Sequence, residues 1–304
     1  MCRPPLPLAL RATSLLLAAL ALGAAGPCGL EKAAELPLVG QAVPVVDVEI
    51  AGQPARLIVD TGAAVMALNQ EAVARLGLRY DRDQRFEVRG IGGSRRSSMP
   101  AIVSGLKLGD VEVADQRAAE LPRGAGGPAL PGVDGVLSLR VLRQFDILLD
   151  MAQRRVTLCR GSPCDDSDVP LTGDVTEVDT GIDPHSLHLA LPVQLDGAGY
   201  RAMLDTGSMG TIVVDRVAAL SDWKLAGDHT LNMRGVGPDK AGAHRHLFAE
   251  LTVGDDTADK PMLLVAEDPG MDFDIILGMD YLASRPIFLS FSTNRLYLQK
   301  PAGR

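Results

Sequence analysis

The chain has 304 residues, which is enough for two domains that each bury a core of their own. Only 4 % of the residues are aromatic, so such cores have to be built from aliphatic side chains. The formal net charge of −8 argues against nucleic-acid binding, because a protein of that class carries a basic face. The short basic pair Arg95-Arg96 does not change this conclusion, and we expect it to be solvated at the tip of a loop.

The first 27 residues have the features of an export signal. Arg3 and Arg11 flank the start, Leu and Ala fill almost all of the run from Leu15 to Leu22, and small residues occupy positions 23–26. The apolar run is too short for a transmembrane helix, and no other segment is a candidate. We therefore expect a signal peptide over 1–27 and a periplasmic or secreted mature protein.

The cysteines suggest how the exported chain is modified. Cys28 stands where a lipoprotein would carry its lipid, but Pro27 precedes it instead of a small residue, so we expect membrane contact only if Cys28 is lipidated. Cys159 and Cys164 enclose a short turn and are expected to form a disulfide. Metal binding is the alternative for this pair, but no histidine lies near and two ligands are too few. Cys2 leaves with the signal.

Two parts of the chain show the same series of expected elements: a strand hairpin, Asp-Thr-Gly, a short helix, a glycine-bearing segment, an apolar strand and a final strand pair. In the first part they are 44–50 with 56–59, Asp60-Thr61-Gly62, 70–76 capped by Asn69, 88–93, 133–138, and 147–149 with 155–158. In the second part they are 187–193 with 200–204, Asp205-Thr206-Gly207, 216–220 capped by Asp215, 232–237, 273–278, and 287–289 with 295–298. Gly90 and Gly235 each follow the aspartate of their half by 30 residues, an agreement that chance does not readily produce.

This repeat divides the chain into a first lobe over 38–160, a linker over 161–184 and a second lobe over 185–300. Residues 29–37 are expected to be a short, poorly ordered lead-in. The linker has little periodicity and is rich in turn-forming residues. It contains a third tripeptide, Asp179-Thr180-Gly181, which we interpret as chance because no hairpin leads into it.

Three sequence features together point to a known protein family. They are the two Asp-Thr-Gly triplets that follow apolar residues, the two glycine-bearing segments and Ile275-Ile276-Leu277-Gly278. With them, the chain from Val43 to Leu298 resembles aspartic proteases of the retropepsin and pepsin type, and most of all their bacterial exported relatives with both lobes in one chain. The resemblance implies an all-β, bilobal acid-protease fold, in which two β-barrel-like lobes with short helices are related by a pseudo-two-fold axis. It also implies a monomer with intramolecular lobe pairing. The alternative is a dimer that exchanges lobes.

The resemblance makes Asp60 and Asp205 the catalytic pair for hydrolysis of a peptide or protein substrate. Two carboxyls at close range do not both ionise readily, so they share one proton, a behaviour known from aspartic proteases themselves and taken over here with the resemblance. One carboxylate acts as general base on a water molecule, and the protonated partner donates to the carbonyl oxygen of the scissile bond. This mechanism needs no cofactor and no metal.

Four residues next to the pair have supporting roles in the family. The hydroxyls of Thr61 and Thr206 are expected to bond across the lobe interface. Gly62 and Gly207 are expected to let backbone amides approach the carboxylates, which a β-carbon would obstruct. The chain departs from the family pattern at Ser138, where the family has glycine, and this departure concerns the loop geometry of the first lobe.

The two glycine-bearing segments are candidate flaps that close over a bound peptide. They are Gly90-Ile91-Gly92-Gly93 and Gly235-Val236-Gly237. Ordinary hairpin turns are the alternative, and neither segment carries the tyrosine of the pepsin flap. The five histidines form no strong metal pattern. A non-catalytic peptide-binding module that kept the fold is the alternative function, and the presence of both aspartates favours the enzyme.

Overall fold

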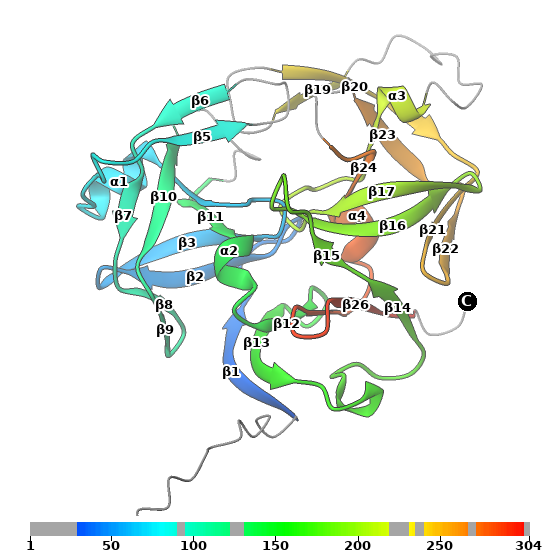
Figure 1. The fold of residues 1–304 in the computed structure, drawn as a ribbon, viewed down its shortest axis with the longest axis horizontal. Helices are drawn as coiled ribbons and strands as arrows, with labels where there is room; N and C mark the ends of the chain where they lie inside the picture. The colour runs from blue at the N-terminus through cyan, green and yellow to red at the C-terminus, as the bar shows by residue number, and fades with distance from the viewer. Residues whose placement is uncertain are drawn as a thin grey trace, which may run out of the picture.

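The computed structural model describes residues 29–89, 95–121, 131–218, 231–234, 240–266 and 272–300. The predicted signal peptide and Cys28 lie outside these ranges. Within them, strands form three large sheets and one two-stranded hairpin, so the all-β prediction is confirmed. In Figure 1 the two lobes lie side by side, with the third large sheet beneath them. No helix in the described ranges is long and apolar enough to cross a membrane.

The first lobe is an eight-stranded curled sheet. Its strands are, in spatial order, β7 (Ala101–Val103), β10 (Gln116–Leu121), β4 (Met66–Asn69), β11 (Gly135–Ser138), β3 (Gln53–Asp60), β2 (Val45–Ile50), β8 (Leu106–Leu108) and β9 (Val111–Val113). β2 and β3 form a hairpin through Ala51 and Gly52, which both have positive φ, the signature of a type I′ turn. β5 (Phe86–Arg89) and β6 (Arg95–Ser98) pair separately above this sheet.

The second lobe repeats this plan in a larger sheet. Its strands are, in order, β19 (Leu231–Arg234), β20 (Lys240–Leu247), β23 (Met262–Ala266), β18 (Ile212–Val214), β24 (Ile275–Leu277), β17 (Ala198–Leu204), β16 (Leu189–Leu195), β21 (Glu250–Val253) and β22 (Asp256–Asp259), with β15 (Gly181–Ile182) beside β16. The hairpin of β16 and β17 turns at Asp196 and Gly197, again both at positive φ. The predicted pair of similar lobes is therefore present.

The third sheet has six strands and joins the lobes. Its order is β1 (Gly29–Pro37), β13 (Arg155–Ser162), β12 (Asp146–Asp150), β25 (Ile287–Ser290), β26 (Arg295–Gln299) and β14 (Val175–Asp179). β12 and β25, the first strands of the final pair in each half of the sequence, pair across its centre, with Leu148 opposite Phe288. Asp146 of the first half strengthens this junction, because its carboxylate accepts bonds from the hydroxyls of Ser290 and Ser292.

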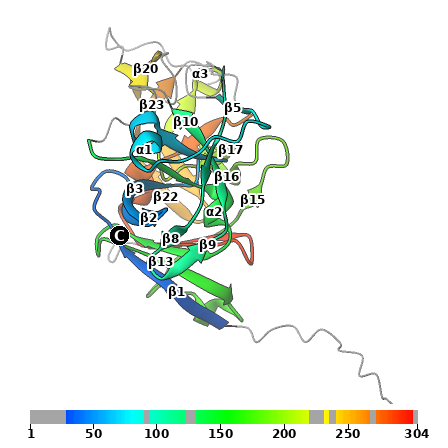
Figure 2. The same cartoon turned by 90° about the vertical axis from the view of Figure 1, so that its left-hand side faces the viewer.

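Two segments that we expected to be irregular are strands of this sheet. Residues 29–37 form β1, which pairs along β13 and buries Ala34 and Leu36 (Figure 2). The expected linker contains β14, β15 and the 3-10 turn η1 (Asp166–Asp168). Both β1 and β14 lie at the sheet edges, so their partners come from distant parts of the chain and their own sequences carry little of the signal.

The helices are short. They are α1 (Gln70–Arg75), α2 (Leu139–Leu142), α3 (Asp215–Ala218) and α4 (Met279–Leu282). α1 and α3 begin within one residue of the two predicted starts, with Asp215 as the first residue of α3, whereas α2 and α4 were not predicted. Asn69 caps α1 as predicted, since its side chain accepts a bond of 2.7 Å from the amide of Ala72. The core around them is mainly aliphatic, and its fully buried side chains include Leu57, Leu137 and Leu139.

The predicted disulfide between Cys159 and Cys164 is wrong. Cys159 is a free, buried thiol within β13, opposite Asp146 on one side and Lys32 on the other. The strand continues from Cys159 to Ser162 instead of turning. Three residues of extended chain separate Cys159 from Ser162 by about 10 Å, so the two cysteines do not lie at the two ends of the tight turn that the prediction assumed.

Candidate active site

Asp60 and Asp205 each stand at the end of a central strand. Asp60 ends β3 and lies opposite Ser138 of β11, while Asp205 follows β17, whose last residue Leu204 pairs with Leu277 of β24. Each of these strands has neighbours on both sides, so its end is held firmly. The interior of the sheets therefore delivers the two side chains to the boundary between the lobes.

Thr61 and Thr206 lock the two loops together through reciprocal hydrogen bonds. The hydroxyl of Thr61 donates to the carbonyl oxygen of Leu204 (2.8 Å) and accepts from the amide of Thr206 (3.0 Å). The hydroxyl of Thr206 donates to the carbonyl oxygen of Val59 (2.6 Å) and accepts from the amide of Thr61 (3.1 Å). Both threonines are buried. Each loop is thus bonded to the backbone of the opposite lobe.

Gly62 and Gly207 are packed against the aspartate of the other lobe. A β-carbon on Gly62 would lie 2.3 Å from Cγ of Asp205, and one on Gly207 would lie 2.5 Å from Cγ of Asp60. Each glycine amide also donates to the carboxylate of its own loop, at 2.9 Å for Asp60 and 2.8 Å for Asp205. The two carboxyls therefore face each other across the lobe boundary, and no side chain fits at either glycine.

The pair is arranged to hold a proton. Burial raises the pKa of Asp60 well above its ordinary value, and the charge of Asp205 raises it further. Burial also raises the pKa of Asp205, against the amides of Gly207 and Ser208, which stabilise its charged form. Both side chains keep partial contact with solvent. A carboxylate and a carboxylic acid side by side can activate water and protonate a carbonyl oxygen in the same step.

The loop of the second lobe has an additional support that sequence reasoning missed. Asp280 of α4 accepts bonds from the amide (2.8 Å) and the hydroxyl (2.6 Å) of Thr211, whose oxygen accepts from the amide of Gly278 (3.1 Å). The first lobe has Arg140 at the position that matches Asp280. A residue-by-residue comparison of the two matched segments would have shown that only the second lobe has an aspartate at this position.

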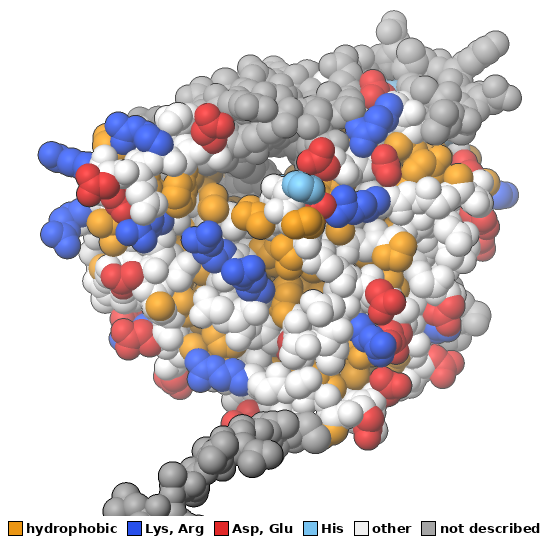
Figure 3. Space-filling model, in the orientation of Figure 1, with side chains coloured by type: hydrophobic (Ala, Val, Ile, Leu, Met, Phe, Trp, Pro, Cys, Tyr) orange, Lys and Arg blue, Asp and Glu red, His pale blue; other side chains and the backbone are white. Residues whose placement is uncertain are grey.

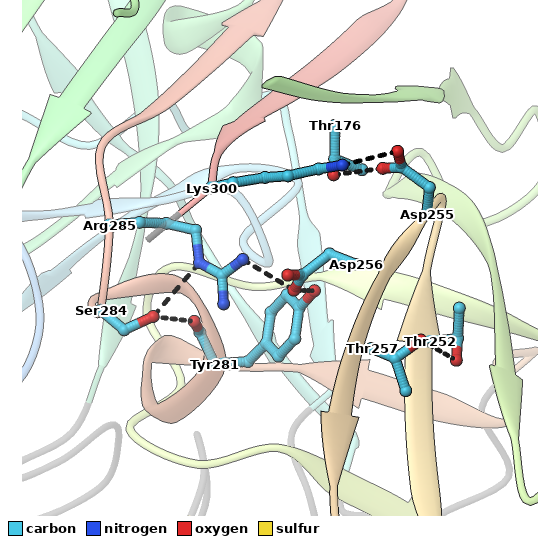
Figure 4. A network of polar contacts seen from close by, with 9 residues as sticks. All are labelled: Thr176, Thr252, Asp255, Asp256, Thr257, Tyr281, Ser284, Arg285 and Lys300. Carbon is cyan, nitrogen blue, oxygen red and sulfur yellow. Dashed lines mark hydrogen bonds and ion pairs between the residues drawn. The ribbon is translucent and has the colours of Figure 1, made fainter. Parts of the chain in front are cut away.

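Polar contacts in turn hold α4 against β22 (Figure 4). The guanidinium of Arg285 forms an ion pair with Asp256 at 2.7 Å and lies over the ring of Tyr281. The hydroxyl of Tyr281 donates to the same carboxylate at 2.6 Å. The buried arginine and aspartate are thus paired, and Tyr281 connects α4 to the same carboxylate.

The matching loop of the first lobe keeps only part of this arrangement. The amide of Leu139 donates to the carbonyl of Ala63 at 2.9 Å, as that of Met279 donates to Ser208 in the second lobe. Ser138 replaces glycine there, and its buried hydroxyl has no hydrogen-bond partner among the described residues. The serine at position 138 therefore leaves the hydrogen bond between Leu139 and Ala63 intact.

The other predicted residues are placed as follows. The candidate flaps 90–93 and 235–237 lie outside the described residues, but the strands that lead into them pair, with Arg89 opposite Arg95 and Arg234 opposite Lys240. Asp179 ends the edge strand β14 with its side chain 88 % exposed and near Arg295. In the described part of the chain, no group of three or more acidic, His or Cys side chains is placed to hold a metal ion.

Comparisons with known proteins were made for sequence and for structure. A family model described as aspartyl protease matches residues 46–140 and 191–281, one stretch in each lobe. The crystal structure of aspartic proteinase from Irpex lacteus is similar, with a TM-score of 0.56 and 16 % identity over 88 % of this chain and 97 % of that chain. At this identity the likeness concerns the fold alone. A search of curated protein sequences gives no match.

Proposed function

Because the chain belongs to the aspartyl protease family, we propose that it is an exported endopeptidase that hydrolyses peptide bonds with a water molecule activated by Asp60 and Asp205. The observation that carries the proposal is the reciprocal packing of each carboxyl against the glycine of the other lobe. This packing brings together two carboxyls that are 145 residues apart in sequence. A binding module has no need of two partly buried acids with raised pKa values.

In the proposed reaction, the ionised carboxylate of the pair takes a proton from water as the water attacks the carbonyl carbon. The protonated carboxyl gives its proton to the carbonyl oxygen, which produces a gem-diol intermediate. The carboxyl that took the proton from water then protonates the leaving nitrogen, and the C–N bond breaks as a diol hydroxyl returns its proton to the other carboxylate. The amides of Gly62 and Gly207 hold the two carboxyls in place throughout. The pair titrates as a unit, so the activity should have a bell-shaped pH dependence.

The substrate would be an extended peptide that lies between the lobes. Figure 3 shows apolar side chains gathered in the middle of one face, between the two lobes. Met209, four residues after Asp205, leaves 52 % of its surface exposed. An apolar side chain beside the catalytic loop favours peptides with apolar residues next to the cut. The Leu- and Ala-rich N-terminal segment supports export.

Substitution of the aspartates tests the activity. Asp60→Asn and Asp205→Asn should each abolish cleavage of a peptide library, because each removes one of two proton-transfer roles, and the circular dichroism of both variants should stay that of the wild type. Asp179→Asn is the matched control, since it changes an identical tripeptide on an exposed strand end. If either dyad variant cleaves as fast as the control, the protein is not an aspartic protease. A folded wild type without cleavage across pH 3–8 would favour the peptide-binding module.

A further inference from the structure

Cys164 is oxidised, although Cys159, its predicted partner, is not. Among the described cysteines Cys159 is the free thiol, whereas Cys164 takes part in a disulfide. The partner of Cys164 therefore lies elsewhere in the protein. The chain has four cysteines, so the remaining candidates within one chain are Cys2 and Cys28.

The pairing of β1 with β13 directs the residue before Gly29 towards Cys164. The two strands are antiparallel, and the pair at this end of the ladder is Gly29 opposite Ser162. The contact here is close, because a β-carbon on Gly161 would lie 2.1 Å from the carbonyl oxygen of Gly29. Cys28 precedes Gly29 and Cys164 follows Ser162, so the antiparallel direction takes both cysteines to the same end of the sheet.

The lengths of chain involved are within the reach of a disulfide. Cys28 lies outside the described residues, but its Cα is about 3.8 Å from that of its bonded neighbour Gly29. Cys164 is two residues from Ser162, which is about 7 Å of extended chain at most. Opposite residues of an antiparallel ladder have Cα atoms about 4.5–5.5 Å apart, and a disulfide joins Cα atoms about 4.4–6.8 Å apart.

The surroundings of the two described cysteines explain why Cys164 is the one that is oxidised. The amide of Cys164 donates to the carboxylate of Asp168 in η1 (2.7 Å), which fixes the backbone just after β13. Cys164 is exposed, so an oxidant can reach it. Cys159 is buried, and burial raises the pKa of its thiol, which lowers the share of reactive thiolate.

Removal of the predicted signal leaves a single candidate partner. The signal covers residues 1–27, so Cys2 is lost with it and Cys28 becomes the first residue of the mature chain. An exported chain also enters a compartment in which disulfides form and persist.

We propose that Cys28 and Cys164 form a disulfide that ties the N-terminus of the mature chain to the end of β13. The inference rests on the export in the proposed function and not on the activity. The two thiols lose two protons and two electrons, which a dithiol oxidant takes up as its own disulfide is reduced to two thiols. β1 is an edge strand with one neighbour, and the bond fixes its free end.

The proposed bond also decides the modification of Cys28. A lipid would be attached through the same sulfur atom, so the disulfide and lipidation exclude each other. The mature chain is then held at its N-terminus by its own sheet and carries no lipid on Cys28.

Peptide mapping of the purified mature protein tests the bond. Trypsin cleaves after Lys32 and Arg160, which places Cys28, Cys159 and Cys164 in three different peptides. After alkylation in denaturant without reduction, the Cys28 and Cys164 peptides should be joined and should separate on reduction, while Cys159 should already be alkylated.

Four results of this mapping would overturn the inference. They are alkylation of Cys28 and Cys164 without reduction, a lipid on Cys28, a Cys164 peptide joined to Cys2, and one joined to Cys164 of a second copy. Joined Cys28 and Cys164 peptides from a chain that keeps residues 1–27 would support the bond and contradict export.

Melting temperatures give an independent test. Cys28→Ser and Cys164→Ser should each lower the melting temperature by on the order of 5–10 °C. The double variant should lower it no further, because both substitutions remove the same bond. A reductant should bring the wild type to the melting temperature of the double variant, whereas Cys159→Ala should keep the joined peptides. If the losses of the two single variants add up in the double variant, the two cysteines are not bonded to each other.

Discussion

The threonine lock between the lobes allows a quantitative test by Thr206→Val. Valine has the shape of threonine and a similar preference for extended backbone, so the substitution leaves no cavity and removes only the hydroxyl. Two buried hydrogen bonds are lost, to the carbonyl of Val59 and from the amide of Thr61. Each buried group that loses its partner costs about 1–3 kcal/mol, so the free energy of unfolding should fall by about 2–6 kcal/mol.

Urea-induced unfolding followed by circular dichroism measures this loss. Thr206→Ser, which keeps the hydroxyl, should recover most of it. Thr252→Val is the matched control, because its hydroxyl bonds to that of Thr257 at the surface (2.9 Å), and it should cost less than about 0.5 kcal/mol. If Thr206→Val destabilises the protein no more than Thr252→Val does, the lock does not hold the lobes together and the reasoning is refuted.

Three further predictions concern the same region. Asp60→Asn should be more stable than the wild type at pH 7 and equal to it near pH 3, as measured by urea unfolding at both pH values. The reason is that the folded protein raises the pKa of Asp60, and an acid with a raised folded pKa lowers the free energy of unfolding as the pH rises above its unfolded pKa. Gly207→Ala should lower both peptide turnover and melting temperature, since its β-carbon would meet Asp60, whereas Gly199→Ala, in open space, should leave turnover unchanged. Asp280→Ala should lower the free energy of unfolding by about 1–3 kcal/mol in denaturant titrations, because it leaves the buried donors of Thr211 without their acceptor.

The features that sequence reasoning placed correctly are local ones. The hairpin before Asp60 follows from alternating apolar residues and a turn at Gly52, and the start of α1 follows from Asn69. The features that it missed depend on distant partners. β1 and β14 are edge strands whose pairing partners lie far along the chain, and Cys159 is buried by a strand that continues where a turn was expected.

The sequence by itself determined which residues form the two similar halves, because matched motifs at equal intervals identify Asp60 and Asp205 and set the third Asp-Thr-Gly, at Asp179, apart. Only the tertiary structure decided what these residues touch. The bond of Thr61 to Leu204 and the packing of Gly62 against Asp205 both join positions more than 100 residues apart. Periodicity along a chain reports which face of an element is buried, whereas contacts of this kind arise only when two finished lobes pack against each other.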